Sequence, residues 1–215
     1  MDGAVATKAS PAPLPPLRAA SDRIAAPAAN EALIVSYEPA TGAELWRGKP
    51  CDVNEVVDRA RRAWPEWAAQ PLSTRMELLR RFANEVRKEA ENLAVLIARE
   101  VGKPLWEAHS EVESVVAKVE VSIRAYAERT SQRKLDSALQ GAMAVRHKPH
   151  GVLLVLGPYN FPAHLPNAHI VPALIAGNAV VFKPSEKAPA TGELLARCFH
   201  RAGIPAGVVQ LAIGG

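Results

Sequence analysis

The chain has 215 residues, of which 48% are hydrophobic and 22% charged, and it carries a formal net charge of +4. This composition supports a folded core, and the lack of any long uncharged apolar span argues against a membrane-spanning protein. Basic and acidic residues alternate as they do on solvated helix faces. We therefore expect neither a nucleic-acid partner nor a membrane partner despite the positive charge.

The first 30 residues are rich in Ala and Pro, which predicts a disordered leader because such a stretch neither sustains a helix nor buries much surface. No apolar run in it is typical of a secretion signal. Cys51 and Cys198, the two cysteines, stand far apart, which favours neither a disulfide framework nor a metal site. A cytoplasmic protein without a bound metal is expected.

A mainly helical segment is expected over residues 31–133, and it opens with a hairpin. The run Leu33–Tyr37 is β-like, and a turn signal at Pro39–Gly42 leads from it toward Trp46. These features predict two short strands joined by a turn.

Three amphipathic helices should follow the hairpin. Asp52 and Glu55 form a capping box at the start of the first. Gly102 with Pro104 supplies the stop of the second. In all three, apolar residues recur at helical spacing with charged residues between them. The expected helices run from Val53 to Pro65, from Ser73 to Val101 and from about Leu105 to Arg129.

The remaining residues divide into an arm and an α/β unit. Residues 134–150 are extended in character, whereas residues 151–215 alternate short apolar runs, typical of buried parallel strands, with helical stretches. This β-α-β-α-β order predicts the first half of a Rossmann-like, doubly wound cofactor domain, so the fold class is α/β with N-terminal helices. Strands are expected at Val152–Leu156, Ala179–Phe182 and Val208–Ile213, and helices at His169–Ala176 and Thr191–Ala202.

The loop after the first of these strands carries a candidate catalytic residue, because ligands bind at the carboxyl ends of the strands in such a sheet. The loop lacks a Gly-x-Gly-x-x-Gly turn for pyrophosphate. Instead Asn160, flanked by Pro158 and Pro162, presents an amide N–H that suits an oxyanion donor. The alternative is that Asn160 merely closes an Asx-turn.

The loop after the second strand has the sequence Lys183-Pro184-Ser185-Glu186. At this strand end a carboxylate can accept from both hydroxyls of the adenosine ribose, so Glu186 favours NAD. Lys183 can instead meet a ribose 2′-phosphate, which keeps NADP open. The alternative is that Ser185 or Glu186 caps the helix that follows.

Three ordered blocks, at 157–162, 172–178 and 180–186, resemble the aldehyde dehydrogenase superfamily, and the resemblance extends from about Ser36 to the last residue. Within it, Gly157–Ala173, with Tyr159 where most members carry Trp, and Gly102–Ala108 are similar to the branch that oxidises N-succinylglutamate 5-semialdehyde in bacterial arginine catabolism. A small anionic aldehyde is then the implied substrate.

The resemblance implies roles for both loops. Asn160 becomes the oxyanion donor in a mechanism in which a cysteine thiolate attacks the aldehyde, hydride passes to NAD or NADP, and a glutamate-activated water hydrolyses the thioester. The arm at 134–150 resembles the family's oligomerisation segment, which implies a homo-oligomer at full length. The residues expected to contact the cofactor are Gly157, Pro158, Tyr159, Lys183, Ser185 and Glu186.

One feature of the sequence departs from the family. The nucleophile and the general-base glutamate of the family lie beyond the third strand, where this sequence stops. Cys198 falls in the middle of an expected helix and Cys51 just ahead of one, so neither suits that role. We therefore expect this to be the N-terminal part of such an enzyme, inactive by itself. The alternatives are a dehydrogenase for another aldehyde and a truncated product that only binds a partner.

Overall fold

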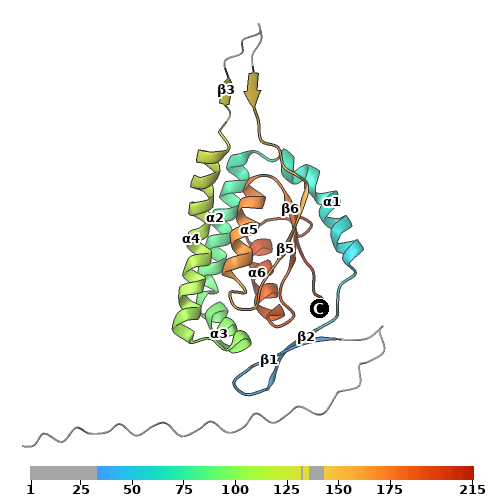
Figure 1. Cartoon of the computed structure of the whole chain (residues 1–215), viewed down its shortest axis with the longest axis vertical. Coiled ribbons are helices and arrows are strands. Elements are labelled where there is room, and N and C mark those ends of the chain that lie inside the picture. The colour runs from blue at the N-terminus through green and yellow to red at the C-terminus, as the bar shows by residue number, and fades with distance from the viewer. Residues whose placement is uncertain (1–32, 132, 136–142) are drawn as a thin grey trace, which may run out of the picture.

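The computed structural model describes residues 33–131, 133–135 and 143–215. They form a layered α/β body around a small parallel sheet (Figure 1), as expected from the sequence. The sheet has the strand order β5-β6-β7, with β5 (Val152–Leu156), β6 (Ala179–Lys183) and β7 (Val209–Leu211). The two connecting helices are α5 (His164–Ile175) and α6 (Pro189–Arg201).

The central strand β6 separates two apolar layers, because successive side chains of a strand point to opposite faces. Val180 and Phe182 join the main core with α5 and α6 on one face. Ala179 and Val181 pack on the other face against α1 (Val53–Ala69). The helices α2 (Leu72–Lys88), α3 (Ala90–Val101) and α4 (Leu105–Arg129) form a further layer outside α5 and α6.

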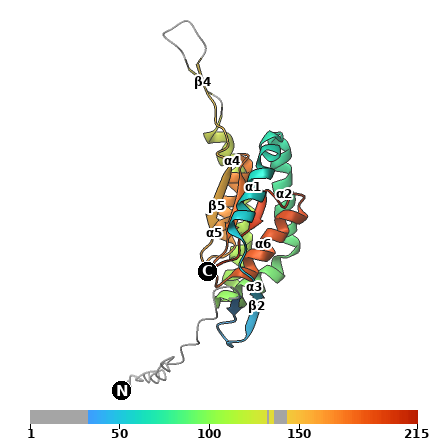
Figure 2. The same cartoon turned by 90° about the vertical axis from the view of Figure 1, so that its right-hand side faces the viewer.

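The expected hairpin and the expected arm are both present as antiparallel strand pairs. The hairpin pairs β1 (Ile34–Tyr37) with β2 (Glu44–Gly48). In the arm, β3 (Arg133–Leu135) pairs with β4 (Met143–Val145), and it projects from the layered body (Figure 2). The leader at 1–30 lies outside the described residues, as does part of the arm, residues 136–142.

The first helix was expected to end at Pro65, which is wrong, because α1 continues to Ala69. Proline removes one helical N–H, so continuing through it needs support from tertiary contacts. The last turn has that support, since the indole N–H of Trp67, which is 2% exposed, donates to the carbonyl of Leu174 at 3.2 Å.

The stretch expected as one helix from Ser73 to Val101 is two helices that break at Glu89. Figure 1 shows α3 turned away from the axis of α2. The apolar stripe runs through the break, so periodicity alone does not detect it. The carboxylate of Glu89 pairs with Arg201 of α6 at 2.9 Å, which ties the break to the neighbouring layer.

Two expectations for the parallel unit also need correction. The helix α5 begins at His164, earlier than the expected His169. The strand β5 is not fully buried, because Leu154 is 60% and Leu156 66% exposed. It lies at the edge of the three-stranded sheet, where Val152 packs against the α1 layer but Leu154 and Leu156 line a hollow beside that helix.

None of the helices in the described ranges combines the length and the apolar character that crossing a bilayer requires.

Candidate functional site

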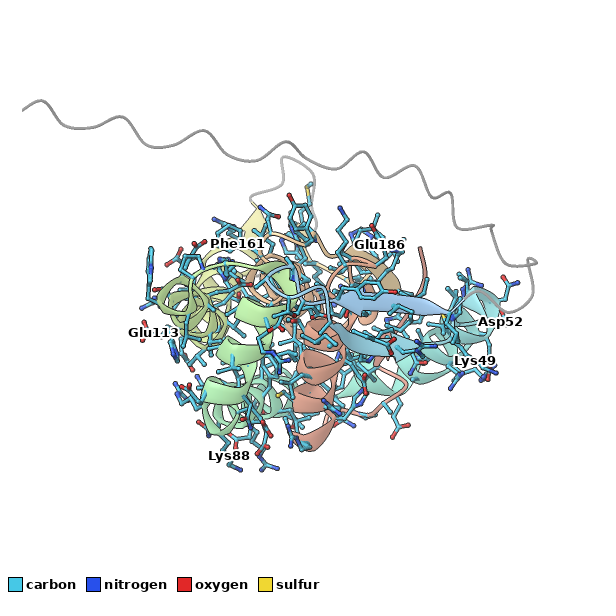
Figure 3. All side chains as sticks on the ribbon, turned by 90° about the horizontal axis from the view of Figure 1, so that it is seen from below. Lys49, Asp52, Lys88, Glu113, Phe161 and Glu186 are labelled. Carbon is cyan, nitrogen blue, oxygen red and sulfur yellow. The ribbon has the colours of Figure 1, made fainter. Side chains whose placement is uncertain are left out.

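The loops that follow β5 and β6 lie together at one end of the sheet. Figure 3 labels one residue of each loop, Phe161 after β5 and Glu186 after β6. The N–H of Gly157 donates to the carbonyl of Lys183 at 2.8 Å, which joins the two strand ends. A Cβ added at Gly157 would stand 2.9 Å from the ring of Phe182, closer than real Cβ atoms approach. Glycine is therefore required where the first loop leaves its strand.

The side chain of Asn160 is exposed at the tip of the first loop. An Asx-turn would need the N–H of the residue two positions on, which is Pro162 and has none. The next donor, the N–H of Ala163, is bonded to Glu111 at 2.9 Å. The Asx-turn alternative is therefore wrong, and the amide of Asn160 has no hydrogen-bond partner within the described residues.

The second loop orders itself by local hydrogen bonds. The Oγ of Ser185 accepts from the N–H of Lys187 at 3.2 Å, and the ammonium of half-buried Lys183 donates to the carbonyl of Pro184 at 3.3 Å. The side chain of Glu186 is exposed to solvent. The carboxylate of Glu186 is therefore accessible to a ligand at this strand end, and the Lys183 ammonium keeps N–H donors besides the one bonded to Pro184.

The helix-cap alternative for this second loop is also wrong. The N-cap of α6 is Ala188, and no side chain of Ser185 or Glu186 bonds the first turn of the helix. The carboxylate of Glu100 takes that place, since it accepts from the N–H groups of Ala190 at 2.9 Å and Thr191 at 2.8 Å.

A second distant carboxylate does the same for α5. Glu111 accepts from the N–H groups of Ala163 and His164 at 2.9 and 3.0 Å. These caps come from 52 and 90 residues earlier in the chain, from α4 for Glu111 and from α3 for Glu100. Sequence reasoning missed both residues, because a Glu inside an amphipathic helix is usually one of its solvated charges.

The structure brings some of the predicted cofactor residues together and separates others. Tyr159 and Glu186 line a hollow of about 410 Å³ with Lys187, whose ammonium lies 5.3 Å from the centroid of the Tyr159 ring. Lys183 lines a larger hollow of about 650 Å³ on the α1 side of the sheet, with Leu156 of β5. Lys183 and Glu186 thus face two different hollows at the same strand end.

Of the two cysteines, Cys198 is not placed as a reactive nucleophile. Cys198 is fully buried in α6, and burial raises the pKa of its thiol, which disfavours the thiolate. Cys51 is half-buried, and its backbone N–H donates to Ile213 at 2.9 Å just after β7. The described residues also contain no cluster of three or more His, Cys, Asp or Glu that could hold a metal ion.

The sequence of the chain is similar to that of known proteins. Residues 26–215 match the model of the aldehyde dehydrogenase family. Over 182 residues the chain is 82% identical to an N-succinylglutamate 5-semialdehyde dehydrogenase from Novosphingobium aromaticivorans, and 64% identical to one from Sphingopyxis alaskensis. The matches cover 85% of this chain, but 39% and 38% of the relatives. The chain thus spans about two fifths of their length.

Solved structures agree with the sequence relatives. An NADP-dependent glyceraldehyde-3-phosphate dehydrogenase from Bacillus halodurans, complexed with NADP, superposes with a TM-score of 0.80 at 30% identity. A NAD-dependent benzaldehyde dehydrogenase from Corynebacterium glutamicum superposes with a TM-score of 0.79 at 29% identity. Both matches cover 86% of this chain, and 40% and 41% of the solved chains. The two relatives differ in the nicotinamide cofactor that they use.

Proposed function

Because the chain belongs to the aldehyde dehydrogenase family, we propose that it supplies part of the cofactor domain of an enzyme that oxidises N-succinylglutamate 5-semialdehyde to the carboxylic acid with NAD. The observation that carries this proposal is the exposed amide of Asn160, which has no hydrogen-bond partner among the described residues, next to a loop that offers a carboxylate and an ammonium. The identity to the two relatives that act on this semialdehyde supports the choice of substrate.

In the proposed reaction Asn160 is the catalytic residue of this region. Attack of a thiolate on the aldehyde carbon places a full negative charge on the former carbonyl oxygen, and the amide N–H of Asn160 donates to that oxygen. An amide suits this role because it donates without itself changing charge. Cys198 does not suit the role of that thiolate, because it is fully buried and burial raises the pKa of its thiol.

The residues of the two loops fit a nicotinamide dinucleotide. Glu186 would accept from the ribose hydroxyls and Ser185 would donate to them, whereas Lys183 would reach the same ribose from the hollow on the α1 side. The backbone of residues 157–159 would line the nicotinamide side. The bound cofactor supplies the acceptor for the hydride. The exposed carboxylate of Glu186 favours the free diol of NAD over the 2′-phosphate of NADP, because like charges repel.

The arm supports a further part of the proposal, which is that the full-length enzyme is a homo-oligomer. The strands β3 and β4 project from the layered body, and Met143 and Val145 are exposed on β4. An exposed apolar strand in a projecting arm is suited to pair with a neighbouring subunit.

The activity is tested by assaying a full-length enzyme built on this sequence for NADH formation. We expect turnover of N-succinylglutamate 5-semialdehyde with a kcat/KM at least about tenfold above that for benzaldehyde. A site that binds the anionic groups of the semialdehyde has polar groups of its own, and the neutral ring of benzaldehyde would leave these groups unpaired. The 215-residue chain, assayed in parallel, should form no NADH. Equal kcat/KM for the two aldehydes would contradict the substrate, and the absence of NADH from the full-length enzyme would contradict the activity.

The ribose contact is tested separately by Glu186→Gln in the same enzyme. The substitution should weaken NAD about tenfold, as expected for loss of a charged hydrogen-bond acceptor, and leave NADP unchanged or slightly tighter. Fluorescence titration with each cofactor measures both dissociation constants. The control is Glu113→Gln, which changes an exposed glutamate of α4 and should alter neither. Equal losses for NAD and NADP would remove Glu186 from the ribose site.

A further inference from the structure

The loop that carries Asn160 is held from the N-terminal helices by a buried ion pair. The side chain of Glu111 on α4 is fully buried, and its Oε1 accepts from the two N–H groups, of Ala163 and His164, at the start of α5. Its Oε2 accepts from the ammonium of Lys103 at 2.7 Å. One carboxylate thus fixes the end of the loop and binds a cation at the same time.

The cation of this pair reaches the loop at a second point. Lys103 lies between α3 and α4 with 8% of its side chain exposed, and its Nζ is 4.0 Å from the centroid of the Phe161 ring. This is cation–π distance, and the interaction is strengthened where water is excluded. Phe161 is the residue directly after Asn160, so the ring anchors the loop next to the amide.

Between these anchors the backbone has little freedom. Pro162 fixes its own φ, Phe161 is held by Lys103, and the N–H of Ala163 is held by Glu111. The amide of Asn160 has no partner of its own among the described residues, so this backbone sets the position of its Cα–Cβ bond and hence the space that the amide can reach. We propose that Lys103 and Glu111 are positioning residues for the oxyanion donor Asn160, an inference that rests on the proposed function.

Glu100 offers a matched comparison, because it is an equally buried carboxylate that caps α6, the helix after the cofactor loop. It accepts from the N–H groups of Ala190 and Thr191, and also from the hydroxyls of Ser36 at 2.9 Å and Thr191 at 2.7 Å. The two acids therefore differ in which loop they hold and in their remaining partners, an ammonium for Glu111 and hydroxyls for Glu100. Loss of Glu111 should act on kcat, and loss of Glu100 on the KM for NAD.

The kinetic test uses Lys103→Met and Glu111→Gln in a full-length enzyme built on this sequence. Methionine removes the cation at similar length, and glutamine turns N–H donors toward the ammonium. Each should lower kcat about tenfold with the KM for NAD unchanged, because small displacements of a catalytic group cost rate rather than binding. Glu107→Gln removes the weaker partner of Lys103, at 3.7 Å, and should keep kcat within about twofold. Glu100→Gln should instead raise the KM for NAD.

A double-mutant cycle separates positioning from general damage to the fold. In an Asn160→Ala background, Lys103→Met and Glu111→Gln should cost no further kcat, because the group that they position is already gone. Hydrogen exchange supplies a readout besides activity, since Glu111→Gln should speed exchange at Ala163 and His164 but not at Ala190. Should Glu111→Gln fail to fold, Lys103→Met decides the question alone.

The outcomes distinguish this inference from the function on which it rests. Normal kcat in Lys103→Met, or a loss of the same size with and without Asn160, overturns the positioning role while Asn160 keeps its own. Normal kcat in Asn160→Ala overturns the proposed function of that residue, and the positioning role falls with it.

Discussion

Asn160→Ala should lower kcat about 10²- to 10³-fold in a full-length enzyme built on this sequence, which corresponds to about 3–4 kcal/mol of lost transition-state stabilisation. The amide is exposed and has no partner in the described structure, so the substitution removes a donor without opening a cavity. The KM for NAD should change little, because the oxyanion forms only during the reaction. Single-turnover measurement of NADH formation isolates the chemical step.

Three controls make the result specific to the amide N–H. Asn160→Asp keeps the shape but turns a carboxylate toward the oxyanion, so kcat should fall at least as far as in Asn160→Ala. Asn54→Ala removes an exposed amide from α1 and should leave kcat unchanged. The free energy of unfolding should stay within about 0.5 kcal/mol for Asn160→Ala. An unchanged single-turnover rate would remove Asn160 from the mechanism.

The parts of the site that the sequence predicts are those that local chemistry determines. The strands end at a short polar loop in each case, and parallel strands place those loops at one edge of the sheet. Asn160 and Glu186 are predicted on this basis, and the structure leaves both side chains exposed. Pro162 already argues against an Asx-turn in the sequence, since it has no N–H to donate.

The parts that the sequence does not predict depend on contacts between distant elements. Glu100 and Glu111 occupy positions in helices where a glutamate is usually solvated, yet both are buried caps. The early start of α5 at His164 follows from one of these caps. Likewise the exposure of Leu154 is set by the position of β5 at the edge of the sheet, whereas an apolar run alone predicts burial.

The largest loss of stability is expected from a substitution in the central strand β6, which packs against helices on both faces. Phe182→Ala should lower the free energy of unfolding by about 3–5 kcal/mol, because the ring is fully buried in the middle of the sheet. Its two edges lie so close to Gly157 and Gly192 that a Cβ there would stand 2.9 and 3.4 Å from the ring. The ring therefore packs between the first loop and α6, where Pro184 also lies close to Gly192.

Urea unfolding of the wild-type and variant proteins measures the loss, and Phe182→Leu is the matched control. Leucine fills part of the same space, so its cost should stay below that of alanine. Because one ring supports both loops, Phe182→Ala should weaken NAD binding and lower kcat together, unlike Asn160→Ala, which acts on kcat alone. Equal stability of the alanine variant and the wild type would show that the core closes over the missing ring, and the spacing of the two loops would then depend on the buried caps instead.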